Sequence, residues 1–318
     1  MSKDSTRPSQ SSLGSLECAF VLKAHCTSHF APYGTVAEGH VQDSKLTQAD
    51  AGLTFPLEPG NLGLRRLPMP QLLRTSNPAL NDKAFRTDDV AFGQETMTVN
   101  GTVNKTGILL ILALITSVWT WNLFLHSRSP ETVMPLAAVG GIGGFIVGMV
   151  TVFKKKWSPI TAPMYALLEG LLLGSVSALF EVRFPGLPIQ AVSLTFGVLV
   201  VMLLAYRWGV IPVNNKLRMG IVAATGGIFL IYFAEFILGF FGIHFTTINS
   251  ASPIGIGFSV VVVVIASLNL VLDFDFIERG AQAGAPKYME WYGAFGLIVT
   301  LIWLYFEMLR LLSKIRER

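Results

Sequence analysis

The chain has 318 residues, of which 52% are hydrophobic and 14% are charged, and its formal net charge is +4. Soluble domains contain about 25% charged residues, so this composition argues against a soluble protein and indicates lipid as the solvent for most of the chain. The basic excess is too small and too scattered to indicate nucleic acid as a partner.

The first 106 residues differ in composition from the rest. They are rich in Ser, Pro, Gly and Thr, contain acidic and basic residues in equal number, and show no sustained apolar period. We expect a largely disordered tail at residues 1–73 and a cytoplasmic juxtamembrane segment at 74–106. The only two cysteines, Cys18 and Cys26, lie in this tail and predict neither a disulfide framework nor a metal site.

Seven apolar stretches follow, each long enough to cross a bilayer core of about 30 Å, which takes roughly 20 helical residues. Charges, Pro or Gly bound each stretch, and the connections are short, so residues 107–318 are predicted to form one all-α bundle of seven transmembrane helices. The predicted spans are 107–125, 133–153, 159–180, 187–206, 218–241, 253–275 and 291–312.

Lys and Arg are concentrated in the loops after the second, fourth and sixth spans, as in the run Lys154–Lys156. By the positive-inside rule, the N-terminus faces the cytoplasm and the C-terminus faces outward. The basic last segment, "RLLSKIRER", conflicts with this orientation. A six-span topology with one re-entrant segment would remove the conflict, and the two topologies stay open at this stage.

Small residues recur at helical spacing in two spans. Gly140, Gly144 and Gly148 share one face of the second span, and Gly170 and Gly174 share one face of the third. Such faces let helix backbones approach closely in lipid, so we predict tight helix packing here and not a ligand site.

Carboxylates inside the predicted spans are the strongest functional signal, because each costs about 2.5 kcal/mol or more near the bilayer centre. Two such acids close together share a proton and titrate as a pair, which is the chemistry of a proton sensor or a cation path. The candidates are Glu169, Glu235, Asp273, Asp275 and Glu307.

Asp273 has two interpretations. It lies twenty residues after Pro253, about 30 Å along a helix, and so it could mark the end of the span. Asp273 shares a face with Asn269, whereas Asp275 points to nearly the opposite side, so a polar stripe favours Asp273 as the inward acid. By the same depth count, Glu169 lies near the midplane, and Glu235 and Glu307 lie in the outer half.

No pattern indicates an enzyme. The sequence lacks H-E-x-x-H and G-x-S-x-G, and no span carries histidines at metal-ligand spacing. We therefore predict neither catalysis nor a bound cofactor.

Several segments together resemble a bacterial branch of the Bax inhibitor-1 family, also called the transmembrane Bax inhibitor motif family. The resemblance covers about residue 74 to the C-terminus. It rests on the segments "RTSNPALNDKAF", "MTVNGTVNKTGILLIL", "APMYALLEGLLLGSVSALFE", "NLVLDFDFIE" and "KYMEWYGAFGLIVTLIWLYFEMLRLLSK".

The resemblance implies a fold in which two three-helix layers surround a central last helix. It also implies a pH-sensitive calcium leak channel, closed by two aspartates that share a proton. Asp273 matches the sixth-helix aspartate, and Glu307, in "LYFE", stands where the family has the seventh-helix aspartate. Thirty-four positions separate the two, so they meet only if the sixth helix starts after Pro253 or runs well beyond Asp275.

Our first hypothesis is a multi-pass protein of the bacterial cytoplasmic membrane that lets cations leak across it, with calcium as the expected ion. Asp273 and Glu307 would respond to protons, with the other three acids as further lining. The alternative is a membrane interaction protein that regulates a membrane protease or a stress response without ion transport.

Because Met69 lies just before the resembling region, we also expect residues 1–68 to be an upstream extension from a misplaced start codon.

Overall fold

The structure is a computed structural model that describes residues 95–318, except residue 128 and residues 243–245. Side chains at 240, 246 and 247 are likewise outside the description. The expectations for the tail at 1–73, for the start site and for most of the segment 74–106 concern residues that lie outside this range.

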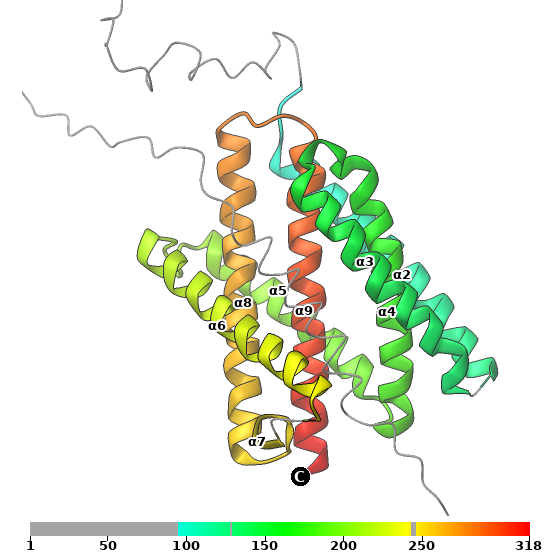
Figure 1. Cartoon of the computed structure of the whole chain (residues 1–318). Helices are drawn as coiled ribbons and strands as arrows, with labels where there is room; N and C mark the ends of the chain where they lie inside the picture. The colour runs from blue at the N-terminus through cyan, green and yellow to red at the C-terminus, as the bar shows by residue number, and fades with distance from the viewer. Residues whose placement is uncertain (1–94, 128, 243–245) are drawn as a thin grey trace, which may run out of the picture. The chain divides into compact units, whose positions relative to one another are not determined.

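The prediction of seven transmembrane helices is confirmed. Seven helices are long and apolar enough to cross a membrane. In the part of the chain that is described, the backbone forms no strand, and Thr96 and Pro286 make a single isolated bridge. The elements in chain order are α2 (Val99–Ser127), α3 (Pro130–Phe153), η3 (Lys155–Trp157), α4 (Ser158–Arg183), α5 (Leu187–Arg207), α6 (Asn215–Phe240), α7 (Thr246–Asn249), α8 (Pro253–Gln282) and α9 (Met289–Glu317) (Figure 1).

Local sequence explains where α6 and α8 begin. Asn214 caps α6, since its side chain accepts a hydrogen bond of 2.7 Å from the Leu217 amide. Ser252 caps α8 in the same way through the Gly255 amide, at 3.1 Å, and Pro253 occupies the first turn, where its missing N–H costs nothing.

Two helices extend beyond the predicted apolar stretches. α2 begins at Val99 and not at 107, because its polar first turns contact protein: the Thr98 amide and hydroxyl both donate to Glu290 at 2.9 Å. α8 ends at Gln282 and not at 275, and Arg279 pairs with Asp275 one turn earlier, at 2.9 Å. A hydropathy pattern ends a span at its first charged residues. Here the helices continue past those residues, because the charged and polar side chains are bound by other residues of the protein.

The last helix, α9, is the central element, as the resemblance implies. Of its most apolar stretch, 78% is buried by protein, against 22% for each of α2, α5 and α6. It packs against α2, α4, α5 and α8. The remaining helices form two groups of three, because α2, α3 and α4 contact one another and α5 and α6 both contact α8.

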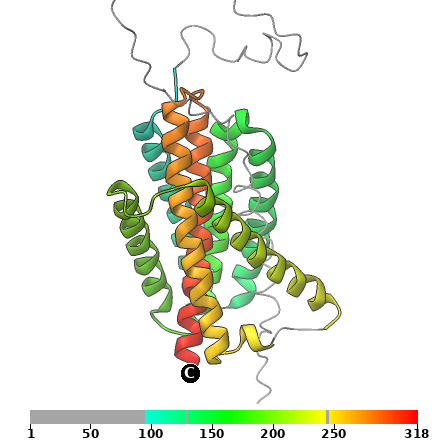
Figure 2. The same ribbon diagram turned by 90° about the vertical axis from the view of Figure 1, so that its left-hand side faces the viewer.

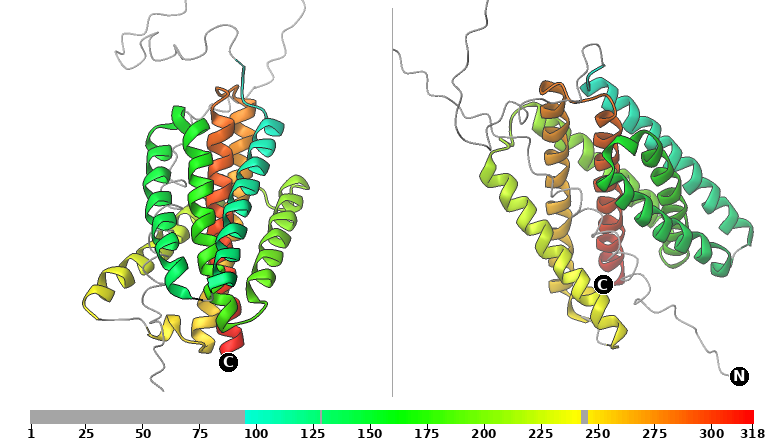
Figure 3. Two further views of the ribbon diagram at one scale, coloured as in Figure 1. Left: turned by 90° about the vertical axis from the view of Figure 1, so that its right-hand side faces the viewer. Right: turned by 45° about the horizontal axis from the view of Figure 1, so that its top comes forward.

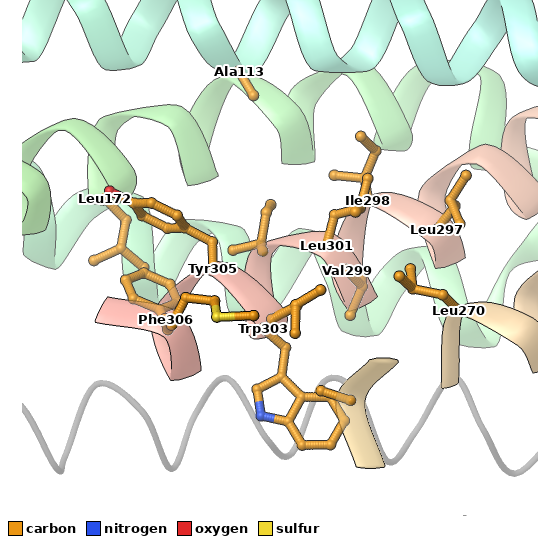
Figure 4. Packing of buried hydrophobic residues seen from close by; sticks show 14 of the residues in the cluster. Ala113, Leu172, Leu270, Leu297, Ile298, Val299, Leu301, Trp303, Tyr305 and Phe306 are labelled. Atoms are coloured by element: carbon orange, nitrogen blue, oxygen red, sulfur yellow. The ribbon is translucent and has the colours of Figure 1, made fainter. Parts of the chain in front are cut away.

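The core therefore runs along α9. Ile298, Trp303 and Leu304 of α9 are at most 1% exposed. Figure 4 shows these packing relations, with Ala113 of α2, Leu172 of α4 and Leu270 of α8 arranged around α9, and with the Trp303 indole extending away from Ala113 and Leu172. Large apolar side chains on the outer faces of the other helices are exposed, as expected for lipid contact.

The glycine faces pack tightly, as predicted. A Cβ at Gly140 would lie 2.6 Å from the Leu168 carbonyl oxygen, and one at Gly174 would lie 2.9 Å from the Ser117 Cα. A Cβ at Gly170 would overlap Thr116 and the Ala113 carbonyl. Only glycine permits these approaches, so α2, α3 and α4 are joined backbone to backbone.

Helix α6 packs much less closely. Its buried side chains form one narrow stripe, Ile221, Thr225, Ile228 and Tyr232, directed at α8 and α9. Figure 1 shows α6 crossing α8 obliquely, and Figures 2 and 3 show its last turns extending away from the other helices. α6 thus has the small contact area expected of an element that can move.

The close approach of α4 to α2 gives the first prediction. Gly170→Ala should lower the stability of the protein by about 1–3 kcal/mol, because the added methyl group has no room. Thermal unfolding in detergent micelles measures the change. Gly197→Ala is the matched control, because nothing lies within 4 Å of a Cβ there. Equal midpoints for the two variants would contradict the assignment of tight packing.

Candidate functional site

A line of polar side chains runs between α6, α8 and α9, and we call it the polar track. Along α8 it extends from Ser259 to Asp275, sixteen residues or about 24 Å of helix. That length is most of a bilayer core of about 30 Å. Its members are Arg218, Thr225, Tyr232 and Glu235 of α6, Ser259, Asn269, Asp273 and Asp275 of α8, and Thr300, Glu307, Arg310 and Lys314 of α9.

Two arginines bind Asp275 at one end of the track. Asp275 is 6% exposed, and its carboxylate pairs with Arg218 of α6 and with Arg279, one turn along α8. Arg218 joins α6 to α8 through this ion pair. Asp275, which was predicted to point away from the side of Asp273, is therefore also buried, because α6 covers it.

The middle of the track holds a hydrogen bond and a second acid. Asn269 donates to the Thr225 hydroxyl across the α6–α8 interface at 2.8 Å, and both residues are buried. Asp273 points the other way, toward α9, where it interacts with the side chain of Thr300. Its Oδ2 is inaccessible to solvent and accepts no hydrogen bond from the described residues. Asp273 therefore lies against α9 and does not simply mark the end of a helix.

Glu307 is the centre of a buried network nearer the other end. It accepts hydrogen bonds from the Tyr232 hydroxyl at 3.1 and 3.3 Å and from the Trp303 indole at 3.2 Å. Arg310 lies 3.7 Å from the carboxylate and also hydrogen bonds to the Tyr232 hydroxyl. Glu307 is 3% exposed, so its charge is stabilised by these donors and not by water.

The track ends beside α7. Glu235 accepts a hydrogen bond from the Asn249 side chain of α7. Lys314, near the end of α9, binds oxygens of α7 and α8. The same end of the bundle holds Arg183, which pairs with Glu317 at 2.6 Å. Arg310, Lys314 and Arg316 of "RLLSKIRER" thus have partners inside the protein, and the described residues form seven spans without a re-entrant segment.

Asp273 and Glu307 do not meet. The antiparallel contacts Asp273–Thr300 and Ser259–Lys314 place α8 and α9 in one register. In that register Glu307 lies seven residues, about 10 Å, along α9 from the position opposite Asp273. The extension of α8 to Gln282 moves Asp273 away from the helix end but does not bring the two acids together.

Glu169 is separate from the track. It is fully buried on α4, one turn from the equally buried Tyr165. α4 packs against α2, α3, α5 and α9, which places Glu169 on the side of the bundle that contains the glycine faces. Of the five predicted residues, Glu235, Asp273, Asp275 and Glu307 lie along the track and Glu169 does not.

One buried acid was missed in the sequence. Glu290, at the start of α9, is 0% exposed and binds Thr98, Lys105 and Lys287. The hydrogen bond to Glu290 raises the pKa of Lys287 above its usual value. Glu290 precedes the predicted span by one residue, so hydropathy placed it in a loop. The sequence feature that could have indicated it is Lys105, a basic residue just before the first predicted span, which is the ion-pair partner of Glu290.

The contact between Arg218 and Asp275 gives the second prediction. Asp275→Asn should speed amide hydrogen exchange in residues 215–225 by about tenfold, because α6 loses its ion pair to α8. Mass spectrometry of the protein in micelles measures the exchange. Glu131→Gln, an exposed carboxylate in the first turn of α3, is the control and should leave exchange unchanged. Unchanged exchange in Asp275→Asn would mean that apolar packing alone holds α6.

Comparison with known proteins identifies the family. A family model described as "Bax inhibitor 1 like" matches residues 77–317, which include all seven spans completely. No curated protein matches the chain, and no solved structure matches it. Because the match covers well over half of the sequence, the chain belongs to the Bax inhibitor 1-like family.

Proposed function

We propose that this integral membrane protein is a pH-responsive cation leak pathway, with Ca²⁺ as the expected ion, and that the ion passes along the polar track. The observation that carries the proposal is the continuity of the track. Polar side chains of α6, α8 and α9 together lie along about 24 Å of α8, from Asp275 to Ser259, and many of them are buried. Charged groups at this depth are costly in lipid and are typical of ion paths.

The chemistry of the track suits a hard cation. Carboxylate, hydroxyl, amide and carbonyl oxygens are the ligands that Ca²⁺ takes in proteins. The track offers Asp275, Asp273, Glu307 and Glu235 in succession, with Asn269 between them. The opposite side of the bundle, between α2, α3 and α4, also buries hydroxyl groups, but among the described residues of these three helices one carboxylate, Glu169, is buried.

In this proposal, the conformation described corresponds to the closed state. Asp275 is bound by two arginines, and Glu307 is bound by Tyr232, Trp303 and Arg310. Both sets of contacts join α6 to the α8–α9 pair. Opening would separate α6 from that pair and exchange these internal partners for water and ions.

Acid would favour opening in this scheme. Protonation of Glu307 removes the charge that holds Arg310 and weakens the attachment of α6 through Tyr232. Because Asp273 and Glu307 lie about 10 Å apart along the helices, they would not share a proton here, and the response does not need a shared proton.

The alternative, a membrane interaction protein, draws on a different observation. Glu169 and Glu290 are fully buried away from the track, so burial of an acid in this chain does not by itself mark an ion path. If the track acids likewise have no role in ion passage, the protein would act by binding another membrane protein, such as a protease.

For location, we propose the bacterial cytoplasmic membrane, with the Lys154–Lys156 end of the bundle facing the cytoplasm.

Calcium flux into proteoliposomes between pH 5 and 8 tests the proposal. The wild type should leak more at pH 5 than at pH 8. Glu307→Gln should raise the flux at pH 8 roughly fivefold, the change expected if the closed state loses about 1 kcal/mol of contacts, and should flatten the pH profile. Asp273→Asn should change the calcium flux but should leave the pH at which the flux rises, which Glu307 sets, where it is in the wild type.

The exposed substitution Glu131→Gln is the control and should follow the wild type. If folded wild-type protein shows no flux above that of empty liposomes at any pH, the leak proposal fails and the interaction protein becomes the better account.

A further inference from the structure

Lys314 is an unusual residue for its position. It belongs to α9, within a membrane-spanning helix, and is 3% exposed. A lysine near the end of such a helix normally extends its ammonium group to the surface. Here the ammonium group turns into the protein instead, toward α7 and the first turns of α8.

Three neutral oxygens hold the ammonium group. The Lys314 Nζ donates to the Ile248 carbonyl at 2.7 Å, to the Ser259 hydroxyl at 2.8 Å and to the Gly255 carbonyl at 3.2 Å. Ser259 is fully buried. These contacts use all three N–H donors of the group, so its hydration shell is replaced by protein oxygens.

No carboxylate of the described residues pairs directly with Lys314. Arg310 repels its charge through space, and Glu307, Glu235 and Glu317 attract it from outside ion-pair distance. The arrangement is therefore not a salt bridge. It is a set of carbonyl and hydroxyl oxygens, and such oxygens are the ligands with which proteins bind a dehydrated monovalent cation.

We propose that Ile248, Gly255 and Ser259 form a site for a monovalent cation of the size of K⁺, and that the Lys314 ammonium occupies this site as a tethered cation. Lys314 then closes the end of the polar track beside α7. The proposed binding site rests on the positions of the Ile248, Gly255 and Ser259 oxygens around the ammonium group. The role of Lys314 as a plug rests on the proposed leak function.

Lys314→Met tests the site without any need for conduction. The substitution keeps an apolar chain and leaves the three oxygens without a cation. In micelles, replacing N-methylglucamine chloride by potassium chloride should raise the thermal midpoint of this variant by about 3 °C or more, because K⁺ binds the folded state alone. The wild type and Lys216→Met, which removes an exposed lysine of α6, should respond equally little.

Removing one ligand sharpens the test. Adding Ser259→Ala to Lys314→Met should reduce or abolish the potassium effect. If Lys314→Met does not fold in either salt, Lys314→Gln takes its place, since its amide keeps one donor without charge. Absence of potassium stabilisation in the variant that folds would overturn the proposed site.

Flux then tests the plug. In proteoliposomes, Lys314→Met should leak K⁺ severalfold faster than the wild type and Lys216→Met. Potassium stabilisation with no flux in any variant would retain the site and overturn the plug together with the leak function. A wild-type leak that Lys314→Met leaves unchanged would overturn the plug and leave the leak function standing.

Discussion

The burial of α9 by protein is the constraint on which the rest of the structure depends. A helix surrounded by lipid must be apolar on every side, whereas 78% of the central stretch of α9 is covered by other helices. α9 can therefore carry Glu307, Arg310 and Lys314 within a membrane-spanning segment, because donors and acceptors of α6, α7 and α8 satisfy them. The helices that face lipid show the opposite pattern, with large apolar side chains exposed.

The two sides of α9 are held together by different forces. On one side, glycines bring α2, α3 and α4 into backbone contact, and dispersion over such close surfaces does not vary with pH. On the other side, α6 is attached by Arg218, Thr225 and Tyr232, each seven residues from the next, and each bound to a polar group of α8 or α9. The contacts of Arg218 and Tyr232 involve carboxylates and so depend on charge and proton occupancy, whereas the contact of Thr225 is between neutral groups. A change of pH would therefore act on the attachment of α6, whereas the glycine contacts themselves do not titrate; among the described residues of α2, α3 and α4, Glu169 is the buried carboxylate.

The sequence was sufficient for the spans because hydropathy reports burial in lipid. It misplaced the start of α2 and the end of α8, where polar residues continue a helix against protein partners such as Glu290. For the site, four of the five proposed acids lie on the track, since intramembrane charge is visible without a structure. Their partners were not visible. Tyr232 and Glu307 are 75 positions apart, and no local pattern predicts such a contact.

The register of α8 against α9 bears on how protons can act. Ser259 hydrogen bonds to Lys314 near one end, and Asp273 lies beside Thr300 near the other, in the same antiparallel alignment. To bring Asp273 against Glu307, α8 would have to slide by about two turns, roughly 10 Å. Such a slide would break the Lys314 contacts and displace Leu270 from the core around α9. Separation of α6 would break only a few polar contacts and one narrow apolar stripe. The proton response that we propose would therefore cost less through Tyr232 and Arg218 than through a pairing of the two acids.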